Sequence, residues 1–119
     1  MTDRKERQSK MPAAQALVLA ASVDYGDGAV VSRLLLKNEA GSITLFAFDA
    51  GQELSEHSTP FDAFVQVIDG KGEFTVGGKK STLGAGEIIL MPANVPHAVK
   101  APTRFKMLLT MLRAKDAER

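Results

Sequence analysis

The stretch GQELSEHSTPFDAFVQVIDG, residues 51–70, decides the fold of this chain. It begins at a glycine bend, places a histidine at position 57 and continues into AFVQVID (63–69), which predicts a strand closed by Gly70. A second stretch, GEIILMPANVPH (86–97), has the same order of a glycine bend, an apolar run and a histidine. Because His57 and His97 are the only histidines in the chain, the two stretches together suggest one site.

Outward from these stretches, short β-rich runs alternate with turns. The pair Gly77-Gly78 lies between two such runs and is the strongest hairpin signal, and NEAG (38–41) predicts another hairpin. Residues after 22 show no helical periodicity, so we predict an all-β, antiparallel sandwich or barrel. The predicted strands are 30–37, 42–49, 63–69, 73–76, 79–83, 87–91, 97–101 and 104–112.

The composition is that of an ordinary globular domain and argues against several classes of partner. The net charge is +1 with scattered basic residues, so nothing indicates nucleic-acid binding. No apolar run approaches the roughly 20 residues that cross a bilayer, so we expect no membrane contact. The chain has no cysteine, which excludes disulfides and thiolate chemistry and agrees with a cytoplasmic location.

The length of 119 residues fits one domain with polar ends. The start imitates an export signal, but Asp3 and Glu6 lie in its basic part and Gln15 interrupts its apolar part. We therefore expect a polar leader over residues 1–22, a barrel over 23–112 and a polar tail over 113–119.

The two histidine stretches resemble the two motifs of the cupin superfamily, in particular those of its small single-domain conserved-barrel members. The first motif is Gly, His-x-His, Glu and Gly at fixed spacings, and the second is Gly, Pro-x-Gly, His and Asn. The matching positions are Gly51, His57, Thr59, Ala63 and Gly70, then Gly86, Pro92, Asn94, His97 and Ala101. The resemblance implies a double-stranded β-helix, the cupin jelly-roll barrel, over about residues 30 to 112.

The resemblance also implies a metal site, of which this chain keeps half. The family's usual ligands are three histidines and one glutamate, but Thr59 replaces one histidine and Ala63 replaces the glutamate. His57 and His97 remain as candidate ligands for a divalent transition metal (Zn, Ni, Fe, Mn or Cu), with water or a bound molecule completing the shell. Asn94 in place of glycine tolerates the left-handed turn.

Other carboxylates are poor substitutes for the missing glutamate. Glu53 has the same strand phase as His57 but lies four residues away, roughly 13 Å along a strand. Glu56 and Asp62 have the opposite phase and should face outward unless a bulge near Pro60 turns one of them inward.

We expect the two imidazoles to face each other inside the barrel. The other residues expected to line that pocket are Thr59, Ala63, Val65, Gln66 and Met107. Gln66 is one residue out of the inward phase, so it enters the pocket only if the register shifts. A stripe of aromatic and thioether side chains belongs either to the plain core or to an apolar pocket wall; its members are Phe61, Phe64, Phe105, Met91, Met107 and Met111.

These features favour a small-molecule-binding cupin with a weak or absent metal. One alternative is a metal-dependent oxygenase or isomerase acting on a small organic acid or sugar, and another is a non-catalytic scaffold. Imidazoles also exchange protons near neutral pH, and some cupin epimerases pair a His base with a Tyr acid. The only tyrosine, Tyr25, precedes the barrel, so the sequence leaves open whether the chain is an enzyme.

Self-association is the one protein partnership that the sequence predicts. The strand 87–91 is apolar on both faces, and small β proteins must protect their sheet edges. Small cupins also commonly pair through their sheets, so we expect a homodimer. Basic residues at 79, 80, 100, 104 and 106 are expected to form a solvated face.

Overall fold

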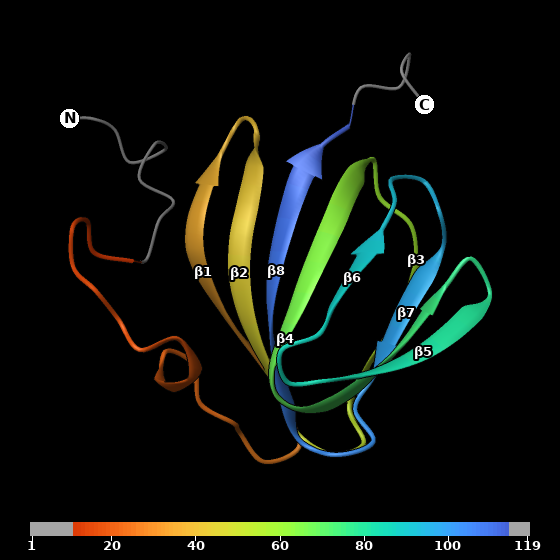
Figure 1. The fold of residues 1–119 in the computed structure, drawn as a ribbon, viewed down its shortest axis with the longest axis horizontal. Helices are drawn as coiled ribbons and strands as arrows, with labels where there is room; N and C mark the ends of the chain where they lie inside the picture. Colours follow the sequence, from red (N-terminus) through yellow and green to blue (C-terminus); the bar gives the residue numbers. More distant parts are fainter. Residues whose placement is uncertain (1–10, 115–119) are drawn as a thin grey trace.

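The computed structural model describes residues 11–114, which form eight strands of a curled antiparallel sheet (Figure 1). The strands are β1 (Val30–Asn38), β2 (Gly41–Phe48), β3 (Glu53–His57), β4 (Phe61–Val76), β5 (Lys79–Gly84), β6 (Ile88–Met91), β7 (His97–Lys100) and β8 (Phe105–Arg113). Their order is β1-β2-β8-β4-β7-β3, and β5 and β6 also pair with β4. The predicted all-β fold is confirmed, and β3 is a strand that the predicted strand ranges did not include.

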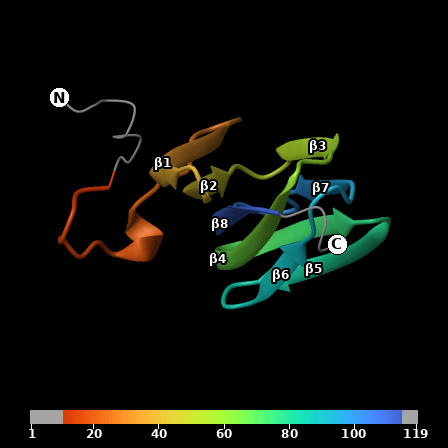
Figure 2. The same ribbon diagram turned by 90° about the horizontal axis from the view of Figure 1, so that it is seen from above.

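The long strand β4 belongs to both halves of the barrel. Its first part, before Gly70, pairs with β8 and β6, and its last part pairs with β5 and β7. The sequence-based prediction that Gly70 ends a strand was wrong, because β4 continues through this glycine and is hydrogen-bonded to neighbouring strands on both sides of it. The strand therefore bends there and carries the sheet around the interior. Viewed from above, β3 and β6 lie on opposite sides of the curl (Figure 2).

Gly70 can hold this bend because it has no Cβ. Its φ is +72°, in the left-handed region, and the pairing of β4 with β8 shifts register just before it, between Val67 and Asp69. A Cβ at Gly70 would lie 2.0 Å from the carbonyl oxygen of Arg104. The close approach of two strand backbones is therefore what requires glycine here.

The main core fills the interior of the curl. Along β4, Ala63, Val65 and Val67 are at most 2% exposed, which gives the inward phase predicted from alternation. Phe105 is completely buried, and its ring stacks on that of Phe48 with centroids 4.6 Å apart. The buried members of this core are Phe48, Ala63, Val65, Val67, Phe74, Leu83, Met91, Val99, Ala101, Phe105 and Met107.

A second, smaller core lies on the outer face of the sheet beneath residues 18–25. It contains Val23, Leu35, Leu45 and Ala47. The segment that covers it runs outside the curl before entering β1 (Figures 1 and 2), and it includes a short 3-10 turn, η2 (Leu19–Ala21). The polar leader predicted over 1–22 falls partly on residues 1–10, and the tail predicted over 113–119 falls partly on 115–119; both parts lie outside the described residues.

The two predicted hairpins are present. Gly77 and Gly78 both have positive φ, at +57° and +86°, as a tight two-residue turn between β4 and β5 requires. Asn94 has a φ of +65°, so it occupies the left-handed conformation expected of this position. Among residues 11–114, no helix is long and apolar enough to span a membrane.

Candidate functional site

His57 and His97 lie opposite each other on neighbouring strands. His57 ends β3, His97 begins β7, and the two are register partners. Their ring centroids are 4.4 Å apart, and the ring planes meet at 68°. His97 is 5% exposed and lies inside the barrel as expected, whereas His57 is exposed and lies at its mouth, so the expectation that both rings lie inside was wrong for His57.

Each ring is oriented by a backbone carbonyl two residues earlier. Nδ1 of His57 lies 2.8 Å from the Ser55 oxygen, and Nδ1 of His97 lies 3.1 Å from the Val95 oxygen. Because a carbonyl oxygen only accepts, these contacts assign the proton of each neutral ring to Nδ1. Nε2 is then left with a free lone pair on both rings, which is the tautomer that metal-binding histidines commonly adopt.

The two rings form part of the wall of a small, mainly apolar cavity of about 50 Å³. A volume of this size holds a few water molecules or a comparably small group. The lining comes from five strands and the β3–β4 turn. It consists of Leu54, His57, Thr59, Ala63, Met91, His97, Val99, Met107, Leu109 and Met111.

The structure brings some predicted pocket residues to this cavity and not others. Thr59, Ala63 and Met107 line it together with the histidines. Val65 is completely buried in the core, and Gln66 has the outward phase of β4 beside Ile88 and Leu108; neither lines the cavity. The Thr59 hydroxyl is 3.3 Å from both the backbone nitrogen and the oxygen of Phe61, so it closes its own turn.

Sequence reasoning missed half of the wall. Leu54, Val99 and Leu109 were not predicted, while Met91 and Met111 were assigned to a stripe without a decision between core and pocket. For β8 the signal was present in the sequence, because residues 107, 109 and 111 alternate on one face of a strand. In the same stripe, Phe105 is core and Phe61 lies beneath the Arg113 guanidinium at 5.2 Å, so the aromatic members do not line the cavity.

The phase predicted for Glu53 was wrong. The pairing of β3 with β7 contains a bulge between Leu54 and His57, where two residues of β3 lie opposite one residue of β7. The bulge turns Leu54 into the cavity and leaves Glu53 beside Lys100, with a nitrogen–oxygen distance of 4.0 Å. Glu56 is exposed, and Asp62 accepts a hydrogen bond of 2.9 Å from the Ala93 backbone nitrogen. None of these carboxylates lines the cavity.

The residues present do not fit the three-histidine, one-carboxylate metal site of the resemblance. Within residues 11–114, no group of three or more His, Asp or Glu side chains is placed to hold an ion. Two neutral imidazoles without an anionic partner offer a divalent ion an incomplete and uncharged shell. A divalent metal is therefore not assigned to this cavity.

Burial lowers the pKa of His97, chiefly through desolvation, with a smaller contribution from a positive charge on His57; the Val95 carbonyl contact opposes both. Because the pKa is lower in the folded chain, the unfolded chain takes up this proton first as the pH falls. The associated stability is complete above the unfolded value of 6.5 and is lost as the pH falls below it through the folded pKa.

We therefore expect the free energy of unfolding to fall as the pH drops below 6.5, and we expect a His97→Gln variant to show a smaller fall over the same pH range. Urea denaturation at a series of pH values measures both slopes. A variant slope equal to that of the wild type would show that His97 does not titrate differently in the folded chain.

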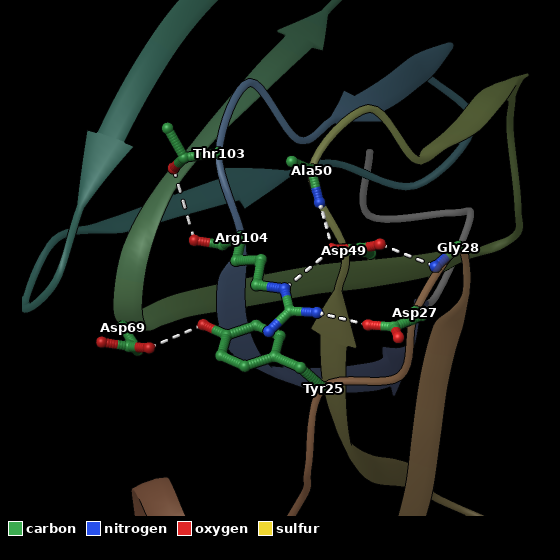
Figure 3. A network of polar contacts seen from close by, with 8 residues as sticks. All are labelled: Tyr25, Asp27, Gly28, Asp49, Ala50, Asp69, Thr103 and Arg104. Carbon is green, nitrogen blue, oxygen red and sulfur yellow. Dashed lines mark hydrogen bonds and ion pairs between the residues drawn. The ribbon is translucent and has the colours of Figure 1, made fainter.

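A second polar cluster lies on the outside of the barrel and holds residues 25–28 in place (Figure 3). The Tyr25 hydroxyl donates to Asp69 at 2.6 Å, and the Arg104 guanidinium lies over the Tyr25 ring and pairs with Asp49 and Asp27 at 2.8 and 2.9 Å. Hydrogen bonds from Arg104 and from the Gly28 backbone nitrogen lower the pKa of Asp49 to about 2. Tyr25 is thus remote from the cavity lining and is no acid for it.

The predicted solvated basic face was wrong at Lys106, which is only 9% exposed and whose Nζ donates to the Ala20 oxygen at 2.6 Å. Arg104 is exposed as expected, but its guanidinium belongs to the Tyr25 cluster. Both side chains attach the segment before β1 to the barrel. Lys79, Lys80 and Lys100 are exposed as expected.

Taken together, the fold and the paired histidines define a class: small antiparallel barrels with an interior cavity. Residues 44–112 match the family description "Cupin domain", and the chain belongs to the cupin family. The resemblance inferred from the two motifs and the predicted double-stranded β-helix are both confirmed.

Solved structures and a curated relative agree with this assignment. The chain is similar to a conserved protein of unknown function from Streptococcus pyogenes, with 34% identity, a TM-score of 0.83 and coverage of 88% of this chain and 92% of that one. A cupin superfamily protein from Desulfitobacterium hafniense is 28% identical with a TM-score of 0.81, covering 87% and 95% of the two chains. An uncharacterised protein of Streptomyces coelicolor is 32% identical over 79 residues, 66% of this chain and 73% of that protein.

Proposed function

We propose that the cavity at His57 and His97 binds a small, largely apolar molecule that donates hydrogen bonds to the two imidazoles. The observation that carries this proposal is the pair of rings at 4.4 Å in the wall of an otherwise apolar cavity. Apolar pockets with a few fixed polar groups are the usual form of small-molecule sites.

The orientation of the rings supports a particular kind of ligand. With both Nδ1 atoms held by backbone carbonyls, each neutral ring presents Nε2 as an acceptor. A hydroxyl, enol or protonated carboxyl group satisfies such an acceptor. The exposed position of His57 lets the remainder of the ligand extend out of the small cavity toward solvent.

We expect metal-free protein, purified without an affinity tag, to gain thermal stability with members of a library of small phenols, enols and organic acids. His57→Ala and His97→Ala should each abolish this shift, because each removes one of the two polar contacts. Glu56→Gln is the matched control, since Glu56 neighbours His57 in sequence but does not line the cavity. Differential scanning fluorimetry followed by calorimetry of each hit makes the comparison.

The outcomes separate the three classes of function. A hit that retains its shift in both alanine variants contradicts the proposal, and a library without hits favours the non-catalytic scaffold. Stoichiometric divalent metal in the natively produced protein, lost in His57→Ala, would favour the metal-dependent enzyme acting on a small organic acid or sugar.

We also propose that the chain forms a homodimer through the outer face of the sheet. A row of side chains crosses five strands on this face through the register pairs Leu36–Ile43, Ile43–Thr110, Thr110–Phe64 and Phe64–Leu90. Leu36 and Leu90 at its two ends are 46% and 54% exposed, and Ile88 beside Leu90 is 58% exposed. Two such faces can pack on each other about a two-fold axis.

Sedimentation equilibrium at micromolar concentration should give the mass of a dimer. Leu90→Lys should give a monomer, because the substitution places a charge within the buried face. Lys79 is exposed and lies on β5, away from this row, so the control variant Lys79→Glu should leave the dimer intact. A monomeric wild type at these concentrations would overturn the proposed assembly.

A further inference from the structure

Three methionines line the same cavity as the two histidines. They are Met91, Met107 and Met111. Two of them flank the residue that replaces the family's glutamate: Ala63 pairs with Met91 of β6 on one side and with Met111 of β8 on the other. Cross-strand partners point to the same face of a sheet. The small side chain of Ala63 thus lies between two thioethers on the inner face of the barrel.

The donor atoms of this cavity are therefore uncharged and mostly soft. They comprise imidazole nitrogens, thioether sulfurs and the Thr59 hydroxyl, which already closes its own turn, and no carboxylate lines the cavity. Thioethers and imidazoles suit monovalent copper, whereas carboxylate and water oxygens suit Mg, Ca and Mn. This cavity therefore differs from the family's divalent metal site both in the number of its ligands and in the kind of ion that its ligands suit.

We propose that this cavity binds Cu(I) through His57, His97 and a thioether of Met91 or Met111. The inference rests on the proposed function only in using the same cavity. Both Nδ1 atoms contact backbone carbonyls, so Nε2 is the free nitrogen on each ring, and rings at 4.4 Å can serve one ion with metal–nitrogen bonds of about 2 Å.

Burial favours the monovalent ion further. His97 is 5% exposed and Met91 is 3% exposed, so an ion held by both is largely removed from water. The cost of desolvating an ion rises with the square of its charge, and an uncharged shell offsets less of this cost than an anionic shell does. A singly charged ion therefore loses much less on entering this cavity than a divalent one.

The competing explanation is that the methionines only pack the core, as methionine often does. Leucine substitutions distinguish the two, because leucine keeps a similar apolar volume and removes the sulfur. Met11 provides the matched control. It is 39% exposed and does not line the cavity, so Met11→Leu removes a thioether without changing the site.

The test is an anaerobic titration of tag-free protein with Cu(I) in competition with bicinchoninate, a coloured Cu(I) chelator. We expect the wild type to withdraw one Cu(I) per chain. The double variant Met91→Leu/Met111→Leu and the single variant His57→Ala should each lose at least about tenfold in affinity. Met11→Leu should match the wild type, and Zn(II) in competition with a zinc-binding dye should show no comparable uptake. X-ray absorption at the copper edge should show a sulfur neighbour that disappears in the double variant.

Equal Cu(I) affinity of the wild type and the double variant would overturn the proposal, as would tighter binding of Zn(II) than of Cu(I). Circular dichroism and thermal unfolding of each metal-free variant show that it is folded before its affinity is compared. The small-molecule thermal shift is measured on metal-free protein, so failure of the Cu(I) proposal can be distinguished from failure of the proposed function. If Cu(I) does not bind but small molecules still raise the unfolding temperature, only the Cu(I) proposal fails. If small molecules do not raise the unfolding temperature, the proposed function fails.

Discussion

Gly70→Ala should lower the free energy of unfolding by about 3 kcal/mol or more, which is a large fraction of the roughly 5 to 15 kcal/mol that stabilises a typical domain. The added Cβ would lie 2.0 Å from the Arg104 oxygen and 2.9 Å from the Phe105 Cα. Both are backbone atoms of the neighbouring strand segment and cannot move aside as a side-chain end can. The φ of +72° adds a cost of about 1 kcal/mol for any residue with a Cβ.

Gly78→Ala separates the two contributions. Gly78 also has a positive φ, of +86°, but a Cβ there would meet no atom within 4 Å. We expect Gly78→Ala to lower the free energy of unfolding only by the cost of placing a Cβ at positive φ, about 1 kcal/mol. Urea denaturation of both variants measures the difference. If Gly70→Ala is no more destabilising than Gly78→Ala, the close backbone approach at the bend of β4 is not present.

Restoring the two missing ligands should convert the cavity into a divalent metal site. Thr59→His together with Ala63→Glu recreates the set that the family resemblance implies, at two positions that line the cavity. We expect affinity for Zn(II) or Mn(II) to increase by at least about 100-fold over the wild type, because an anionic, four-ligand shell replaces an uncharged two-imidazole one. Isothermal titration calorimetry of tag-free protein measures the gain.

Without metal, the same double variant should be less stable than the wild type by about 1 to 3 kcal/mol. Ala63 is 2% exposed, so its replacement buries a carboxyl group and adds volume to a cavity of about 50 Å³. Added metal should recover this loss, since it binds only the folded chain. Thr59→His with Ala63→Gln is the control of equal volume. Equal metal affinity in the two double variants would show that the carboxylate does not reach the ion.

Much of the fold could be read from local patterns. Alternation along 63–67 gives the inward face of β4, and the glycine pair at 77–78 gives a hairpin, because side-chain phase and positive φ are properties of a few consecutive residues. The spacing of His57 and His97 within two family motifs likewise suggested that they face each other, and the structure has them as register partners.

Other features depended on strands far away in the sequence. The bulge in β3 reverses the phase between Glu53 and His57, and it exists only through pairing with β7. The passage of β4 through Gly70 depends on the backbone of Arg104 and Phe105. Lys106 can be buried because the Ala20 carbonyl accepts a hydrogen bond from its ammonium group, a contact between residues 86 positions apart.

The amino-acid sequence by itself determined the family, the all-β class and the two imidazoles of the candidate site, since these follow from short-range spacing and alternation. Only the tertiary structure decided which side chains close the cavity around them, how little space they leave, and that two thioethers flank Ala63. The physical reason is that a wall built from several strands depends on their mutual register, and register is a property of pairs of strands that no single segment carries.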